Sequence, residues 1–280
     1  MRVRGGRGII ASTMAAIASF LQSVKLPVMP EVAHALIRTL SDDDADIATV
    51  TAIIAKDPGL TATLMRMANS ALFGLSRSVD ALDKAVSVVG MSHMRARALS
   101  ICLANAFVFP PGLQRLEFWR ASMVCAGYAK WLASSLGLDA QQAWLTGMML
   151  RLGELVIAQC EPDTIERIEN LPCPPGDRWE RERAVTGFDE GQITAEIARR
   201  WDFPEAVALA LQTSARPMTD AHSPLGAVVH LAALITDLEA TGTRSLDGLP
   251  LAVVQALGLY LHKLQPEMPH AESFSDISML

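Results

Sequence analysis

The sequence predicts an all-α protein made of two helical subdomains. Apolar side chains recur every three to four residues along most of the chain, which is the period of an amphipathic helix. No segment shows the sustained alternation of a strand, and no strand–helix–strand rhythm is present. Pro110-Pro111-Gly112 breaks helix on both sides, so we place the boundary between the subdomains there.

The first 23 residues combine a basic start with an amphipathic helix. Ile10, Met14, Ile17 and Leu21 lie at helical spacing, so we expect this helix to pack on the body or on a partner. A secretory signal is the alternative, because arginines precede the apolar stretch.

The first subdomain, residues 24–110, contains the clearest helix signals. Pro30 is well placed at a helix start, and Asp57 followed by Pro58 forms an N-cap with proline at the first helical position. Leu60, Leu64, Met67 and Ala71 then form one stripe that ends at Gly74. Further helices are expected within 41–57, 83–90 and 92–107.

The second subdomain, residues 111–240, is predicted to be helical throughout. Its helices are expected over about 117–136, 139–159, 162–169, 177–186, 189–201, 204–212 and 225–240. The stretch DRWERERAV, 177–185, mixes charges at helical spacing and is interpreted as a solvated helix face with local ion pairs. Residues 241–280 are expected to add a C-terminal helix and a loose tail, QPEMPHAESFSDISML.

Composition limits the function classes. The chain has 280 residues and a formal net charge of -6, which argues against broad binding to a phosphate backbone, so no nucleic-acid partner is expected. Arg95 and Arg97 are the only local basic pair that stands out, and they fit a solvated helix face.

No apolar run is long enough to span a membrane, and a cytoplasmic protein is expected. The four cysteines form no CxxC pair.

Sequence motifs for catalysis are missing. None of the six histidines belongs to an HExxH motif or is followed by aspartate, and no GxSxG turn is present. The glycine-rich RGGRG lacks the GK[ST] of a phosphate-binding loop. No cofactor is therefore expected.

Three stretches together resemble the HDOD domain, an all-helical bacterial module related to the HD-type metal-dependent phosphohydrolases. They are LPVMPEVAHALIRTL (26–40), IIAKDPGLTATLMRMANSALFGL (53–75) and KAVSVVGMSHMRARAL (84–99). The likeness continues through TGMMLRLGELVI and GFDEGQITAEIARRWDFPEAV to VVHLAAL. It covers roughly residues 24–240 and implies a second subdomain with a degenerate HD fold.

The resemblance also implies where a catalytic metal site would lie. The histidine-aspartate pair of catalytic relatives matches Leu150 and Arg151, and the other ligand positions match substituted residues. These are Ala121, Glu190, the segment Thr213-Ser214-Ala215, and Ala233. A catalytic metal needs at least three protein ligands, and one carboxylate cannot supply them, so we expect no metal and no hydrolase activity.

Arg151 lies within the apolar run TGMMLRLGELVIA and raises a question of its own. We expect it to replace the metal as the positive charge of the vestigial cleft, with Glu190 as its partner. Glu154 on the same helix is the rival partner. The alternative is that Arg151 reaches water along its own helix and pairs with nothing.

The favoured function is a non-catalytic signal-transduction or scaffold module that binds a protein. One alternative is a sensor that holds a nucleotide or another anion in the vestigial cleft through Arg151, and another is a hydrolase with an unrecognised site. Arg66, Asn69, Ser70 and Phe73 are candidate partner contacts near a helix end. They could equally satisfy backbone groups and fill the core there.

Overall fold

The computed structural model describes residues 16–22, 24, 26–42, 44–70, 78–160, 163–172, 178–219 and 223–275. Over these residues it is all-helical and contains no strand, as the sequence predicts. The chain divides into two compact units. The N-terminal unit comprises 27–108 and 201–204, and the C-terminal unit comprises 109–200, 205–275 and the described part of 1–26. The four-part division expected from the sequence stays a prediction.

The N-terminal unit contains five helices in its described residues. They are α2 (Glu31–Arg38), α3 (Ile47–Ile54), α4 (Pro58–Ala68), α5 (Leu82–Val89) and α6 (Met91–Ala106). Asp57 caps α4 as predicted, because its carboxylate accepts a hydrogen bond from Leu60 N at 2.9 Å. Helix α4 ends at Ala68, and the expected end at Gly74 lies outside the described residues.

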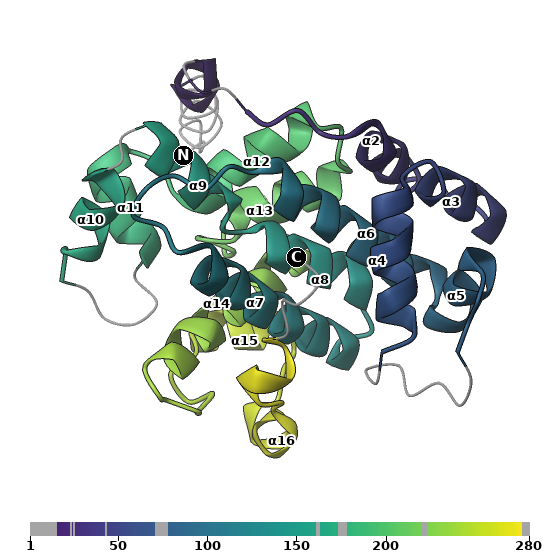
Figure 1. The fold of residues 1–280 in the computed structure, drawn as a ribbon. Coiled ribbons are helices and arrows are strands. Elements are labelled where there is room, and N and C mark those ends of the chain that lie inside the picture. Colours follow the sequence, from purple (N-terminus) through teal and green to yellow (C-terminus); the bar gives the residue numbers. More distant parts are fainter. Residues whose placement is uncertain are drawn as a thin grey trace, which may run out of the picture. The chain divides into compact units, whose positions relative to one another are not determined.

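The C-terminal unit holds the remaining helices, which Figure 1 shows from α7 to α16. They are α7 (Arg115–Ser135), α8 (Ala140–Met149), α9 (Leu152–Cys160), α10 (Asp163–Glu169), α11 (Arg178–Thr186), α12 (Glu190–Arg200), α13 (Glu205–Thr213), α14 (Pro224–Ala240), α15 (Leu251–Ala256) and α16 (Leu261–Leu264). Two short 3-10 turns, Gln265–Glu267 and Ala271–Ser273, follow. Helices α7, α8 and α14 pack together and are buried on several faces, so they form the core that supports the candidate site.

The single helix predicted over 139–159 is broken into α8 and α9 at Leu150 and Arg151. The cause is Thr194 on α12, whose hydroxyl donates to Leu150 O at 2.9 Å and accepts from Gly153 N at 2.8 Å. A side chain of another helix thus forms hydrogen bonds with a backbone carbonyl and a backbone amide at the break between α8 and α9. Helical periodicity continues through the break, which is why the sequence does not reveal it.

The two ends of the described chain pack on the C-terminal unit. Residues 16–22 are helical with Ile17 and Leu21 buried, while Ile10 and Met14 lie outside the described residues. The C-terminal segment is packed rather than loose up to Ser275. The ring of Phe274 lies over Gly127 on α7 and is 5.3 Å from the ring of Tyr128, centroid to centroid. The Tyr128 hydroxyl donates to Pro269 O at 3.2 Å.

The described helices include none that combines the length and apolar character needed to cross a membrane.

Gly153 is predicted to be essential for the contact between α9 and α12. A Cβ at this position would collide with the Glu190 carbonyl oxygen and lie 2.8 Å from Glu190 Cα, so the backbone would have to shift. We expect Gly153→Ala to lower the free energy of unfolding by about 1–3 kcal/mol, as overpacking does. Urea denaturation measures this. Gly248→Ala is the control, because its Cβ would meet only Leu238 at 3.7 Å. Equal losses in both variants would contradict the proposed close approach.

Candidate functional site

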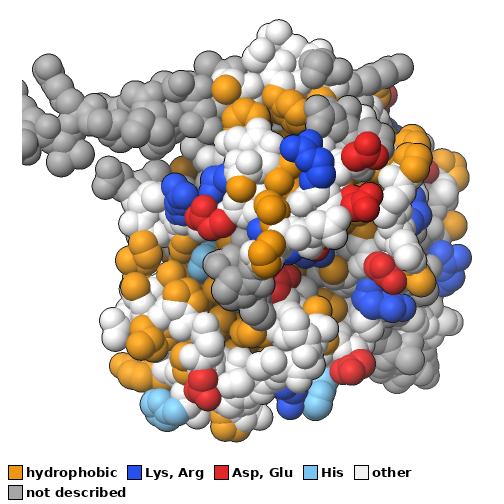
Figure 2. All heavy atoms as spheres, turned by 90° about the vertical axis from the view of Figure 1, so that its left-hand side faces the viewer, with side chains coloured by type: hydrophobic (Ala, Val, Ile, Leu, Met, Phe, Trp, Pro, Cys, Tyr) orange, Lys and Arg blue, Asp and Glu red, His pale blue; other side chains and the backbone are white. Residues whose placement is uncertain are grey.

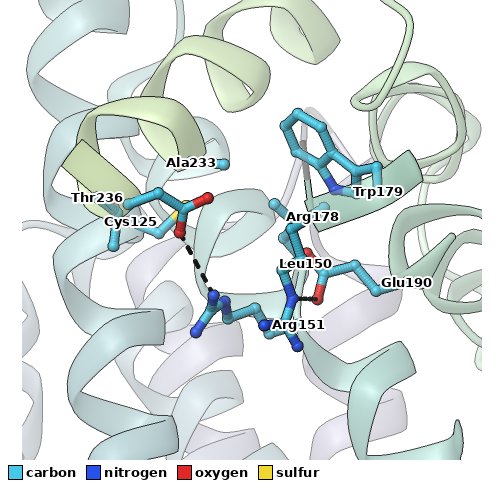
Figure 3. Close-up of a pocket in the computed structure, with 9 residues that line it drawn as sticks. Cys125, Leu150, Arg151, Arg178, Trp179, Glu190, Ala233 and Thr236 are labelled. Carbon is cyan, nitrogen blue, oxygen red and sulfur yellow. Dashed lines mark ion pairs between the residues drawn. The ribbon is translucent and has the colours of Figure 1, made fainter. Parts of the chain in front are cut away.

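A small pocket lies in the C-terminal unit beside the corner between α8 and α9. Its cavity volume is about 10 Å³, which is roughly the room for one water molecule. Its lining comes from α7, the α8–α9 corner, α11, α12 and α14. The residues are Cys125, Leu150, Arg151, Arg178, Trp179, Glu190, Ala233, Thr236 and Asp237 (Figure 3).

Arg178, the first residue of α11, is the centre of a buried ion-pair cluster. Its guanidinium lies 3.0 Å from Glu154 Oε1 on α9 and 2.8 Å from Glu169 Oε1 on α10. The same group contacts Glu182 Oε1 at 3.0 Å and Glu190 Oε2 at 3.7 Å. The Arg178 side chain is only 12% exposed, so little solvent screens these charges. One cation therefore connects carboxylates of four helices.

Arg151 has a different partner from the one expected. Its guanidinium lies 3.5 Å from Asp237 Oδ1 on α14, and no ion pair within 4.0 Å joins it to Glu190 (Figure 3). The expected close Arg151–Glu190 ion pair is thus not formed, since the nearest cation of Glu190 is Arg178. Both side chains nevertheless line the same pocket, and, against the effect of burial, the charges of Glu154, Glu190 and Asp237 raise the pKa of Arg151. Glu154, the rival partner, also pairs with Arg178.

The cluster strongly perturbs its carboxyl groups. Burial raises the pKa of Glu182 to about 7, although the Arg178 guanidinium opposes the shift. Burial, and then the neighbouring charge of Glu182, raise the pKa of Glu190 well above its usual value. Burial lowers the pKa of Arg178, but Glu154, Glu182 and Glu190 outweigh it and raise that pKa well above its usual value. Arg178 is thus a permanent charge beside two carboxyl groups, those of Glu182 and Glu190, whose burial opposes ionisation.

An aromatic stack closes one side of the pocket. The ring of Trp179 lies 5.0 Å from the ring of His230, centroid to centroid, at an angle of 20°. His230 Nδ1 lies 2.7 Å from Ser214 O, which places the ring proton on Nδ1. Burial lowers the pKa of His230 to about 4, so this histidine is neutral near pH 7. The stack holds Trp179 and, through the chain, its neighbour Arg178.

The structure brings some of the expected cleft residues together and leaves others apart. Leu150, Arg151, Glu190 and Ala233 line the pocket. Ser214 does not line the pocket. Its carbonyl oxygen contacts His230, whose ring stacks on Trp179, and Trp179 lines the pocket. Ala121 is not among the lining residues, and Cys125, one helical turn later on α7, lines the pocket instead.

The most central residues of the site were not predicted. Arg178, Trp179 and Glu182 belong to the stretch interpreted as a solvated helix face, but Glu182 is fully buried and Trp179 is 5% exposed. The signal that could have found them is the tryptophan beside the Arg178–Glu182 pair at i,i+4. A large aromatic residue marks the buried side of a helix, and the charges next to it share that side.

The candidate partner contacts at the end of α4 are partly used by the fold. The Asn69 amide donates to Met65 O at 3.0 Å and to Val79 O at 2.9 Å, and its oxygen accepts from Val79 N at 2.7 Å. Asn69 therefore satisfies backbone groups, which was the alternative interpretation. Arg66 is exposed, Ser70 is half-buried, and Phe73 lies outside the described residues.

Comparison with known proteins identifies relatives of this fold. The family model of the HDOD domain matches residues 26–217. An uncharacterized protein of Treponema pallidum (strain Nichols) is 23% identical over 188 residues, which are 65% of this chain and 36% of that protein. The chain thus spans about a third of that relative's length.

Solved structures give the same fold. A protein of Shewanella amazonensis SB2B named as a candidate phosphohydrolase matches with a TM-score of 0.74 at 22% identity, covering 93% of this chain and 96% of that one. A candidate signal transduction protein of Marinobacter aquaeolei VT8 matches with a TM-score of 0.74 at 23% identity, over 94% and 63%. An HDOD domain protein of unknown function from Geobacter sulfurreducens matches with a TM-score of 0.70 at 19% identity, over 96% and 92%.

The cluster predicts that Arg178 matters more for stability than Arg151. Arg178→Met leaves Glu154, Glu182 and Glu190 buried without their common partner, and we expect it to cost about 3–5 kcal/mol at pH 7. Arg151→Met removes one longer pair with a carboxylate that is 27% exposed, so its cost should be clearly smaller. Chemical denaturation of both variants measures the order. A larger loss for Arg151→Met would refute the assignment of Arg178 as the central charge.

Proposed function

The chain belongs to the HDOD domain family, and we propose that it is a non-catalytic regulatory module of bacterial signal transduction that acts by binding another protein. The observation that carries the proposal is the Arg178 guanidinium in the pocket where catalytic HD relatives would hold a metal. One of the structural relatives is itself named as a candidate signal transduction protein. Others are named as candidate phosphohydrolases, so the catalytic alternative must be tested on the residues.

The residues of the pocket do not fit a catalytic metal. Leu150 and Ala233 offer no lone pair, and two guanidiniums, those of Arg151 and Arg178, line the same pocket. A dication placed there would meet two positive charges and too few ligands to leave an open position for water. The described residues include no group of three or more His, Cys, Asp or Glu side chains that could hold a metal ion.

The dimensions of the pocket favour protein binding over a nucleotide sensor. A cavity of about 10 Å³ is much smaller than the several hundred Å³, roughly, of small-molecule sites. The carboxylates beside Arg151 and Arg178 also oppose a phosphate group. On the face shown in Figure 2, acidic and basic side chains are interspersed rather than gathered by sign, which does not favour a nucleic-acid partner.

The first test of the proposal is a search for metal and turnover. We expect purified full-length chain to contain no stoichiometric iron, manganese or zinc, and to hydrolyse neither phosphodiesters nor nucleoside triphosphates when these metals are added. Elemental analysis and phosphate release measure this. Metal-dependent turnover that disappears in Glu190→Gln would overturn the proposal, and Glu205→Gln, an exposed glutamate on α13, is the control.

The second test concerns the partner. We expect the full chain, when it is cross-linked in its own bacterium, to capture a signalling protein. In calorimetry, that protein should bind the purified chain with the same affinity whether or not a chelator is present. In parallel, a thermal-shift series with nucleotides should leave the melting temperature unchanged, because a ligand of the folded state would raise it. A nucleotide that raises the melting temperature in the wild type but not in Arg151→Met would instead support the sensor alternative.

A further inference from the structure

The ion-pair cluster contains more acid than base. Glu154, Glu182, Glu190 and Asp237 face two guanidiniums, those of Arg151 and Arg178. Asp237 is 27% exposed and Glu169, which also pairs with Arg178, is 47% exposed, so water screens both; the three buried carboxylates against two guanidiniums leave one excess negative charge if all are ionised. Glu154, Glu182 and Glu190 are each at most 7% exposed, so water compensates little of this excess.

Two carboxylate oxygens in the cluster have no hydrogen-bond donor. Glu154 Oε2 and Glu190 Oε2 are buried and accept no hydrogen bond from the described residues. Such an oxygen is costly when its carboxylate is ionised, and it costs much less when it carries a proton. The geometry therefore points to one further positive charge at this place.

A proton satisfies the geometry better than any other cation. The cavity has room for about one water molecule, and the two guanidiniums would repel a metal ion in it. A proton needs neither room nor a coordination shell.

The position of Arg178 determines which elements depend on this charge. It begins α11 and contacts Glu169 of α10, Glu154 of α9 and Glu190 of α12. Helix α10 buries only Thr164 and Ile168, and α11 buries only Trp179 and Glu182. Charge contacts therefore add to the small apolar contacts of Ile168 and Trp179 that hold these two helices.

We propose that the cluster is a proton-operated latch: one proton shared between Glu182 and Glu190 fastens α10 and α11 to α9 and α12, and loss of that proton loosens them. The latch regulates the site discussed above and rests on the proposed absence of a metal there.

The direction of the pH dependence follows from the raised pKa values. Burial raises the pKa of Glu182 to about 7 from its usual value of 4.5, and the pKa of Glu190 is raised as well. A carboxyl whose pKa is raised when the latch is fastened stabilises the fastened state. This stabilisation is fully present below a pH of about 4.5 and is lost as the pH rises to about 7. The latch is thus tight near pH 5 and loose near pH 8.

Other charged groups around the cluster do not reverse this direction. They are Glu169 on α10, Arg183 on α11, Asp189 before α12, and His230 and Asp237 on α14. His230 is neutral above about pH 5, because its pKa is about 4. Burial raises the pKa of Asp189 too, so this carboxyl acts in the same direction, and it is tied to Arg183 at 2.6 Å.

Hydrogen exchange of the full chain between pH 5 and pH 8 tests the latch. After correction for intrinsic exchange rates, we expect the opening constant of amides in α10 and α11 to rise about tenfold per pH unit from 5 to 7 and then level off. Glu182→Gln should flatten this dependence. Glu180→Gln is the matched control on the same helix, because Glu180 is 60% exposed, and it should keep the slope.

The exchange experiment would overturn the latch through an opening constant independent of pH, an unchanged slope in Glu182→Gln, or a flattened slope in Glu180→Gln. Infrared spectroscopy of the wild type needs no variant. A protonated carboxyl band present at pH 6 and lost by pH 8 is expected, and its absence contradicts the proposal. Stoichiometric metal at pH 8 that restores protection would overturn the non-catalytic function as well, whereas the other outcomes leave that function standing.

Discussion

The Arg178 guanidinium is the interaction on which the candidate site depends. It joins carboxylates of α9, α10, α11 and α12, and three of these, Glu154, Glu182 and Glu190, are buried and share it as their common partner. A buried ion pair contributes little net stability, but removing one member is expensive because the other charge stays buried. The cluster therefore acts less as a source of stability than as a constraint that permits one arrangement of α11 against the body.

Much of the helical frame could be predicted from the sequence, because it depends on local signals. Asp57 and Pro58 start α4, and the stripe Leu60, Leu64 and Met67 is buried, as periodicity predicts. The break at Leu150 and Arg151 could not be predicted, because its cause is Thr194, 44 residues later. The cluster was missed for a related reason: an Arg–Glu pair at i,i+4 has the same sequence whether water or protein surrounds it, and only the packing of α11 decides that.

The resemblance located the pocket but not its chemistry. Leu150, Arg151, Glu190 and Ala233 line one pocket, as expected, and the helices that carry them are held by close backbone contacts such as Gly153 against Glu190. These contacts do not involve a metal, so the helical frame does not depend on one. The second positive charge of the pocket, in contrast, comes from Arg178 on α11, a helix for which the resemblance implies no site residue.

The corner held by Thr194 has a consequence for how the chain folds during its synthesis. When residues 140–160 leave the ribosome, their apolar period favours one continuous helix, which Gly147 and Gly153 weaken but do not break at Leu150 and Arg151. The hydroxyl that diverts the backbone at Leu150 becomes available only after α12 has been made. The break between α8 and α9 is therefore completed only by a contact that is distant in sequence, and contacts of this kind belong to the class that slows folding.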